Sequence, residues 1–140
     1  MKENRLQKKI IDWLKFDGCH VLRLNSGMID MGGGHMVRLC PPGTPDLLAI
    51  VPPYGRALFL EVKRDKKIAD HWNKVVESFV AGGTVAKSNK PIIDQYKQIV
   101  KIWDSGACAA VVCSIKDVQD ILTQIKNEKS RCSCGGGIAV

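Results

Sequence analysis

The chain has 140 residues, of which 21 are Lys or Arg and 14 are Asp or Glu, so its formal net charge is +7. Apolar residues make up 45%, which excludes a wholly disordered chain, and no apolar run reaches the roughly 20 residues that span a bilayer. The basic charge favours a polyanionic partner such as nucleic acid. Residues 1–5 lead into an amphipathic pattern instead of a signal-peptide core, so we expect a cytoplasmic protein.

The N-terminal quarter predicts one helix and two strands. Helical spacing of apolar residues before a glycine predicts a helix from about residue 3 to 16, on the basis of Leu6, Ile10, Trp13, Leu14 and Gly18. Alternation over 20–25 predicts a strand. Glycines at 27 and 32–34 predict a loose connection to a second strand over 35–40.

The centre of the chain predicts a β-hairpin. Two short apolar runs, 46–51 and 57–63, are separated by the turn-forming residues Pro52-Pro53-Tyr54-Gly55. Their nearly continuous apolar character predicts a central position in the sheet, covered on both faces.

The remaining residues predict helix, helix, strand and helix. Apolar spacing places one helix over about 70–80 before Gly82-Gly83, and a second from Pro91 to about Trp103 before Gly106. Residues 107–113 are a buried-strand candidate. Ser114 and Asp117 then resemble a helix N-terminus, and residues from 127 onward are expected to be a disordered tail. The whole order predicts an α/β fold with a mixed central β-sheet flanked by helices.

The hairpin register predicts a pair of facing carboxylates. If residues 52–55 form a four-residue turn, Val51 pairs with Arg56 and Asp46 lies opposite Glu61. Directly paired Cβ atoms are about 4.5–5.5 Å apart, so the two acids repel one another. A divalent cation between them reverses the sign of that interaction. Hard oxygen ligands favour Mg²⁺ or Mn²⁺.

Lys63 joins this pair by strand alternation, because it lies two residues after Glu61. Its ammonium group is suited to orienting a metal-bound water, stabilising hydroxide, or offsetting charge on the transition state. The alternative is that Asp46 merely starts a strand and that Glu61 and Lys63 are ordinary charges at its end. An unpartnered charge after the apolar run 57–60 is expensive, which favours the functional interpretation. Gly43-Thr44-Pro45 predicts a tight backbone approach, useful where a phosphate must come close.

These residues resemble the signature of a known nuclease superfamily. Gly43-Thr44-Pro45-Asp46, fourteen intervening residues and Glu61-Val62-Lys63 look like the PD-(D/E)XK motif. The residues that flank this motif resemble the VRR-NUC branch of the superfamily, which includes small phage and bacterial nucleases and a eukaryotic repair nuclease. The flanking matches are Glu3-x-x-Leu6-Gln7-x-x-Ile10, Leu24-Asn25-Ser26-Gly27 and Gln95. The resemblance runs from about Glu3 to Asp120.

The resemblance implies both an architecture and an activity. The architecture is a restriction-endonuclease-like αβββαβ core over residues 1–126, with a helical insertion at about 66–90 and a flexible tail at 127–140. The activity is that of a metal-dependent DNA endonuclease, in which Asp46, Glu61 and the Val62 carbonyl bind Mg²⁺ or Mn²⁺. Lys63 assists the attacking water, and Glu3 and Gln95 complete or support the site. Stand-alone members resemble Holliday-junction resolvases, which implies branched DNA, recombination or repair, and a homodimer, in a bacterial or phage setting.

The sequence departs from the family pattern in one place. About thirty residues separate Lys63 from Gln95, where family members often have a shorter spacing. The inserted helix and its Lys-rich flanks are candidates to contact DNA, to form the dimer or to cap the site. The candidate DNA contacts are Asn25, Ser26, Lys66 and Lys67. Structural interpretations of the same residues stay open. Glu3 would then complement the helix dipole, Gln95 would be a surface residue, and the lysines would form a solvated face.

The other chemically distinctive residues predict structural roles. Gly32-Gly33-Gly34 lacks the following Lys-Ser/Thr of a phosphate-binding loop, and no motif surrounds His20, His35 or His71. The three tryptophans, Trp13, Trp72 and Trp103, fit apolar helix faces and are expected in the core. The six cysteines have no zinc-site spacing; four fit apolar strands, and Cys132-Ser133-Cys134 is either a floppy tail or a soft-metal or redox site.

Two rival functions stay open from the sequence. One is a DNA-binding module that has kept the nuclease fold and lost cleavage. The other is a restriction-like endonuclease with sequence preference. For the endonuclease acting on structured DNA, DNA shape and phosphate positioning are expected to govern recognition, because no base-reading motif is evident.

Overall fold

The computed structural model describes residues 2–24 and 28–128. In chain order the elements are α1 (Glu3–Phe16), β1 (His20–Arg23), β2 (Met28–Asp30), β3 (Met36–Arg38), β4 (Leu47–Val51), β5 (Arg56–Val62), α2 (Lys66–Val80), the 3₁₀ turn η1 (Lys87–Asn89), α3 (Lys90–Asp104), β6 (Cys108–Val112) and α4 (Ile115–Asn127). None of the helices in these ranges is both long and apolar enough to cross a membrane.

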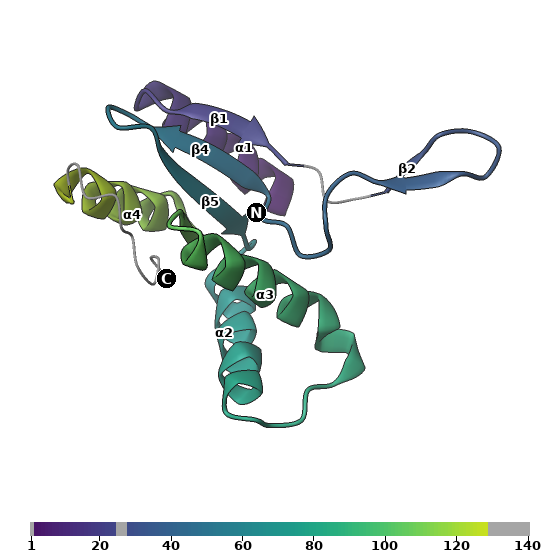
Figure 1. The fold of residues 1–140 in the computed structure, drawn as a ribbon. Helices are drawn as coiled ribbons and strands as arrows, with labels where there is room; N and C mark the ends of the chain where they lie inside the picture. Colours follow the sequence, from purple (N-terminus) through teal and green to yellow (C-terminus); the bar gives the residue numbers. More distant parts are fainter. Residues whose placement is uncertain (1, 25–27, 129–140) are drawn as a thin grey trace.

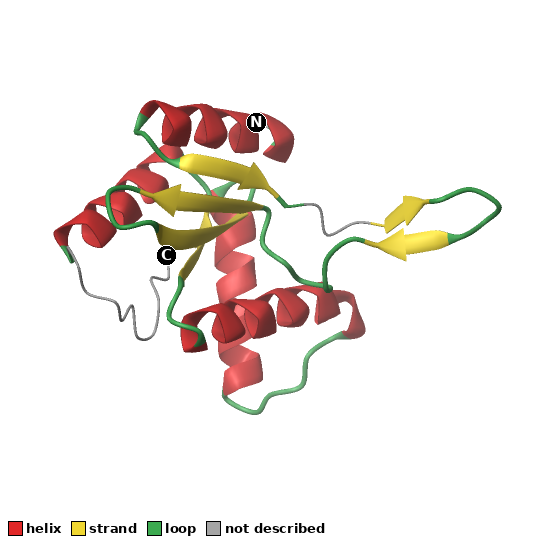
Figure 2. Cartoon of the chain, turned by 45° about the horizontal axis from the view of Figure 1, so that its top comes forward, coloured by secondary structure: helices red, strands yellow, loops and turns green. Residues whose placement is uncertain are grey.

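The main sheet has four strands in the order β1-β4-β5-β6. The pairs β1–β4 and β4–β5 are antiparallel, whereas β5 and β6 run parallel to one another. Helices α1 and α4 cover one face, while α3 and α2 lie on the other (Figures 1 and 2). The predicted mixed sheet flanked by helices is therefore confirmed, and the hairpin strands β4 and β5 occupy its centre.

Burial alternates along the central strands and divides the core into two layers. Leu58, Leu60 and Val62 of β5 pack with α1 and α4 in the larger apolar cluster. Phe59 faces the other way and packs with Trp72 and Ile99 from α2 and α3. Because side chains alternate along a strand, Glu61 and Lys63 share the face of Phe59. The charged residues thus lie on the α2–α3 side, at the end of the strand.

The segment between β1 and β4 differs from the prediction. A strand does form within the predicted range 35–40, but it pairs with β2, Met28 opposite Arg38, and not with the main sheet. The resulting two-stranded ribbon projects from the body of the molecule (Figures 1 and 2). The expectation of a loose connection was wrong because it missed β2. Three exposed residues carry no burial pattern from which to predict a strand.

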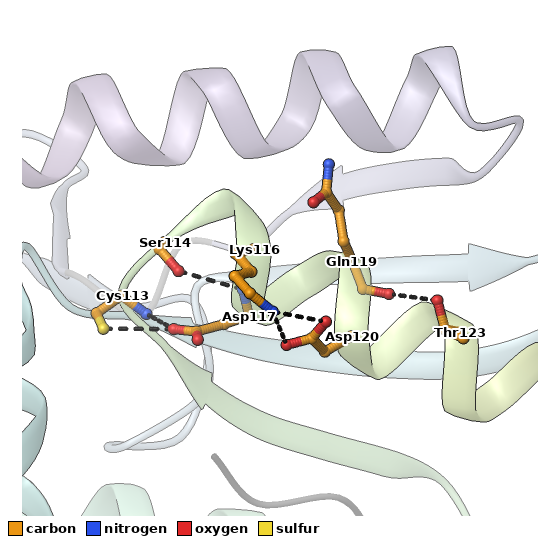
Figure 3. Close-up of polar contacts among 7 residues, drawn as sticks. All are labelled: Cys113, Ser114, Lys116, Asp117, Gln119, Asp120 and Thr123. Atoms are coloured by element: carbon orange, nitrogen blue, oxygen red, sulfur yellow. Dashed lines mark hydrogen bonds and ion pairs between the residues drawn. The ribbon is translucent and has the colours of Figure 1, made fainter.

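Helix α4 begins as the sequence predicted. The Ser114 hydroxyl accepts a hydrogen bond from the Asp117 backbone N–H at 3.1 Å, and the Asp117 carboxylate accepts one from the Cys113 N–H at 2.9 Å (Figure 3). These two bonds satisfy backbone donors at the turn out of β6 and so set the direction of the helix.

The C-terminal boundary lies close to its predicted position. Helix α4 ends at Asn127 and Glu128 caps it, while residues 129–140, most of the predicted tail, lie outside the described residues together with Cys132 and Cys134. No disulfide joins the cysteines within the described ranges, and Cys19 and Cys108 are buried.

Removal of the Ser114 cap tests the start of α4. We expect Ser114→Ala to lower the free energy of unfolding by about 1 kcal/mol, the usual cost of losing such a cap. The matched control is Lys116→Ala two residues later, which removes only an exposed ion pair to Asp120 (Figure 3) and should change the stability by less than about 0.5 kcal/mol. Urea unfolding measures both; equal losses would contradict the prediction.

Candidate active site

The hairpin has the register that the turn predicts. Val51 lies opposite Arg56, and the pairing continues to Leu47 opposite Leu60. The next pair in this register is Asp46 and Glu61. Both side chains line the same cleft, so the acids face one side of the sheet.

This cleft has a volume of about 440 Å³ and polar walls. It gathers residues from the start of α1, the end of β3, the loop before β4, the end of β5 and the first turns of α3. Its lining residues are Glu3, Arg38, Pro42, Gly43, Thr44, Asp46, Glu61, Lys63, Pro91, Asp94 and Gln95. The structure therefore brings together every residue that the sequence proposed as catalytic, namely Glu3, Asp46, Glu61, Lys63 and Gln95.

Asp46 is held by the backbone of the neighbouring strand. Its Oδ2 atom accepts a hydrogen bond of 2.8 Å from the Val62 N–H, which fixes the carboxylate across the open end of the hairpin. Burial raises the pKa of Asp46 and the charge of Glu3 raises it further, while the Val62 N–H and the charges of Lys63 and Arg23 act in the opposite direction.

Glu61 is almost completely buried, with 5% of its surface exposed. Burial, and after it the charge of Asp46, raises the pKa of Glu61 to about 8, although the Lys63 ammonium lowers it. Near neutral pH the site thus disfavours full ionisation of both acids. A group that needs a further cation to ionise is a functional-site candidate.

Lys63 lies between the acids and helix α3. Its Nζ donates to Glu61 Oε1 at 3.1 Å and to Gln95 Oε1 at 3.0 Å. Gln95 Oε1 also accepts a hydrogen bond of 2.8 Å from the indole Nε1 of Trp72. The insertion before α3 has therefore not displaced Gln95 from the site. These bonds hold the ammonium group of Lys63 in one place.

The donor set fits a divalent cation of the magnesium type. Within residues 2–24 and 28–128, no three His, Cys, Asp or Glu side chains are grouped to hold a metal ion. Mg²⁺ is usually bound by one or two carboxylates, with waters and substrate phosphate completing its shell. Asp46 and Glu61 supply two such carboxylates in a polar cleft, and a cation there would offset the repulsion that raises their pKa values. The ligand role of the Val62 carbonyl stays a prediction.

Gly43 has a different neighbour from the predicted one. Its φ is +84°, and a Cβ at this position would lie 2.6 Å from the Gln95 nitrogen and closer still to the carbonyl group of Asp94. The sequence attributed this tight approach to a phosphate, whereas the structure places the backbone of α3 there. The glycine lets the loop before Asp46 pack directly against the helix that carries Gln95.

The structure places two of the four predicted DNA contacts, and neither lines the cleft. Lys66 and Lys67 begin α2 and do not line it, and Lys66 forms an exposed ion pair with Asp70 at 2.9 Å. Asn25 and Ser26 lie outside the described residues. None of the three histidines lines the cleft either.

Three residues near the site were missed as functional candidates. Arg38 and Asp94 line the cleft, and no sequence signal placed them there because both depend on how the ribbon and α3 meet the sheet. Trp72 was assigned to the core, and it is 6% exposed. Its spacing gave no sign that the indole N–H reaches Gln95.

A mixed sheet with two facing acids and a lysine at one end of its central hairpin defines a domain of nuclease fold. The sequence matches no family model and no curated protein. The structure is similar to a solved structure described as a VRR_NUC domain, with a TM-score of 0.51 and 25% identity over 86% of this chain and 94% of that one. This likeness confirms the resemblance to the VRR-NUC family that the motifs indicated.

Substitution of Gly43 tests its contact with α3. Gly43→Ala should destabilise the protein by about 3 kcal/mol, because it adds overpacking to an unfavourable positive φ. Gly55→Ala is the matched control, since Gly55 also has a positive φ, +69°, but has open space around it. The control should lose only the backbone part, about 1–2 kcal/mol. Thermal unfolding compares them; equal losses would show that the close contact is absent.

The raised pKa of Glu61 predicts a pH dependence of stability in the metal-free protein. Between about 4.5 and about 8 the folded state holds a proton on Glu61 that the unfolded chain releases. By linkage, the contribution of Glu61 to the free energy of unfolding falls as the pH rises through this window. Glu61→Gln removes this titration. Urea unfolding at several pH values should therefore show a steeper decline for the wild type than for the variant, and parallel curves would contradict the assignment.

Proposed function

We propose that the protein is a metal-dependent DNA endonuclease that hydrolyses phosphodiester bonds. The observation that carries the proposal is that Asp46 and Glu61 face one polar cleft, with Lys63 3.1 Å from Glu61. Asp46, Glu61 and the Val62 carbonyl would hold Mg²⁺ or Mn²⁺. Bound there, the ion would lower the pKa of a coordinated water and polarise the scissile phosphate.

The other side chains that line the cleft have separate proposed roles. Lys63, held by Glu61 and Gln95, presents a fixed positive charge to the attacking water and to the charge that develops on the phosphate. Gln95 uses its carbonyl oxygen for Lys63 and Trp72, which leaves its NH₂ group as the donor toward the cleft. Arg38 lines the same cleft and is suited to a phosphate oxygen. Glu3 supports the negative potential that attracts the cation.

The substrate is proposed to be branched or otherwise structured DNA, cut by a homodimer. This part rests on the likeness to the VRR_NUC domain and on the resolvase-like character that the resemblance implies. The net charge of +7 favours a polyanion. Asn25, Ser26, Lys66 and Lys67 are proposed to contact DNA outside the cleft. An exposed ion pair such as Lys66–Asp70 is weak, so Lys66 can exchange its partner for a phosphate.

Cleavage of a four-way junction and of supercoiled plasmid tests the activity. Cutting should require Mg²⁺ or Mn²⁺ and stop with EDTA, and Lys63→Ala should lower kcat by about a hundredfold or more. Lys116→Ala is the control, because it removes an exposed lysine on α4 away from the cleft, and its kcat should stay within twofold of the wild type.

Each rival function has its own outcome in this experiment. DNA binding by both the wild type and Lys63→Ala, with no metal-dependent cutting by either, would establish a non-catalytic binding module. Discrete plasmid fragments would indicate a restriction-like enzyme with sequence preference. Paired nicks at the branch point, mapped at nucleotide resolution, are the result expected for the proposed enzyme.

A further inference from the structure

Trp72 contacts the candidate site through Gln95 and does not itself line the cleft. It lies on α2 within the inserted segment, is 6% exposed and belongs to the apolar cluster that includes Ile99 and Val111. Its indole Nε1 donates to Gln95 Oε1 at 2.8 Å. The side chain is not among those that line the cleft, so its single polar contact in the site is this hydrogen bond.

The two donors at Gln95 determine which end of its amide faces which way. The indole N–H of Trp72 and the ammonium of Lys63 can only donate hydrogen bonds. Both lie within 3.0 Å of the same Gln95 atom, so this atom must be the carbonyl oxygen and not the nitrogen. The amide of Gln95 therefore cannot flip without the loss of both bonds.

Packing does not enclose the ring of Trp72 on every side. The indole borders a small apolar cavity of about 140 Å³, which Tyr96 and Trp103 also line. A ring with empty space beside it has lost part of its van der Waals contacts. Its hydrogen bond to Gln95 consequently contributes to its orientation as well as to that of the amide.

We propose that Trp72 is a positioning residue, which fixes the Gln95 amide and through it the ammonium of Lys63. The proposal rests on the proposed nuclease function for its kinetic consequence. The proposal gives helix α2 a role in the site. The helix supplies the indole donor of Trp72, which fixes the side chain of Gln95 next to Lys63.

Trp103 offers a matched control for Trp72. It packs against the same apolar cluster, borders the same cavity and also donates one indole hydrogen bond, to the Ala109 carbonyl at 3.0 Å. Replacement of either tryptophan by Phe removes one N–H donor and shrinks one ring. The two variants differ in whether the lost bond leads to Lys63.

The kinetic arm separates positioning from a merely structural role. Trp72→Phe should lower kcat about tenfold, the rate equivalent of one lost hydrogen bond, with KM within twofold, because Trp72 does not line the cleft. Trp103→Phe should leave both constants within twofold. In a Gln95→Ala background, Trp72→Phe should have no further effect, because both changes break the same link. Equal kcat losses in the two Trp variants, or additive losses in the double variant, would overturn the proposal.

The spectroscopic arm uses metal-free protein and needs no activity. The three indole N–H signals are assigned in a ¹H–¹⁵N spectrum with the two Trp→Phe variants. Gln95→Ala should move the Trp72 signal upfield and leave that of Trp103 in place. An unmoved Trp72 signal would show that the link is absent, whatever the enzyme does. A moved signal in a protein that cuts no DNA would overturn the nuclease proposal and the kinetic role, while the structural link would stand.

Discussion

The register of one hairpin determines the rest of the site. Four residues, Pro52–Gly55, join β4 to β5 and place Val51 opposite Arg56; every pair further along follows from that one. Because side chains alternate along a strand, a slip by a single residue would send either Asp46 or Glu61 to the opposite face. The apolar partners resist such a slip, since Leu47 would leave the core if β4 turned over, and Leu58 and Leu60 would leave it if β5 did. The geometry of the acids is thus enforced by hydrophobic burial and not by the acids themselves.

The same geometry concentrates unfavourable charge. Glu61 is buried beside Asp46 and under the influence of Glu3, and its pKa rises to about 8 even though Lys63 forms an ion pair with it. The ammonium group of Lys63 alone is therefore insufficient to keep both Asp46 and Glu61 ionised near neutral pH. A fold that keeps such a cluster gives up stability at this point, which is understandable where a divalent ion with substrate phosphate completes the balance of charge.

The features that could be predicted from the sequence depend on local rules. The hairpin register follows from a turn length, the shared face of Glu61 and Lys63 follows from strand alternation, and the start of α4 at Ser114 follows from capping chemistry. What was missed depends on tertiary contacts. Strand β2 has three exposed residues and no burial pattern. The neighbour of Gly43 and the partner of Trp72 are backbone and side-chain atoms of α3, and local patterns do not say which helix packs there.

The inserted segment shows why a departure in spacing left the site intact. The insertion begins just after Lys63, and the helix that follows it, α3, contributes Pro91 and Gln95 to the same cleft. Both of its ends are thus anchored at one place, and its length is absorbed by α2 and the connection to α3, which packs against α2. Trp72 is the point at which α2 contacts the candidate site, since its indole donates to Gln95, the residue that the family resemblance indicated.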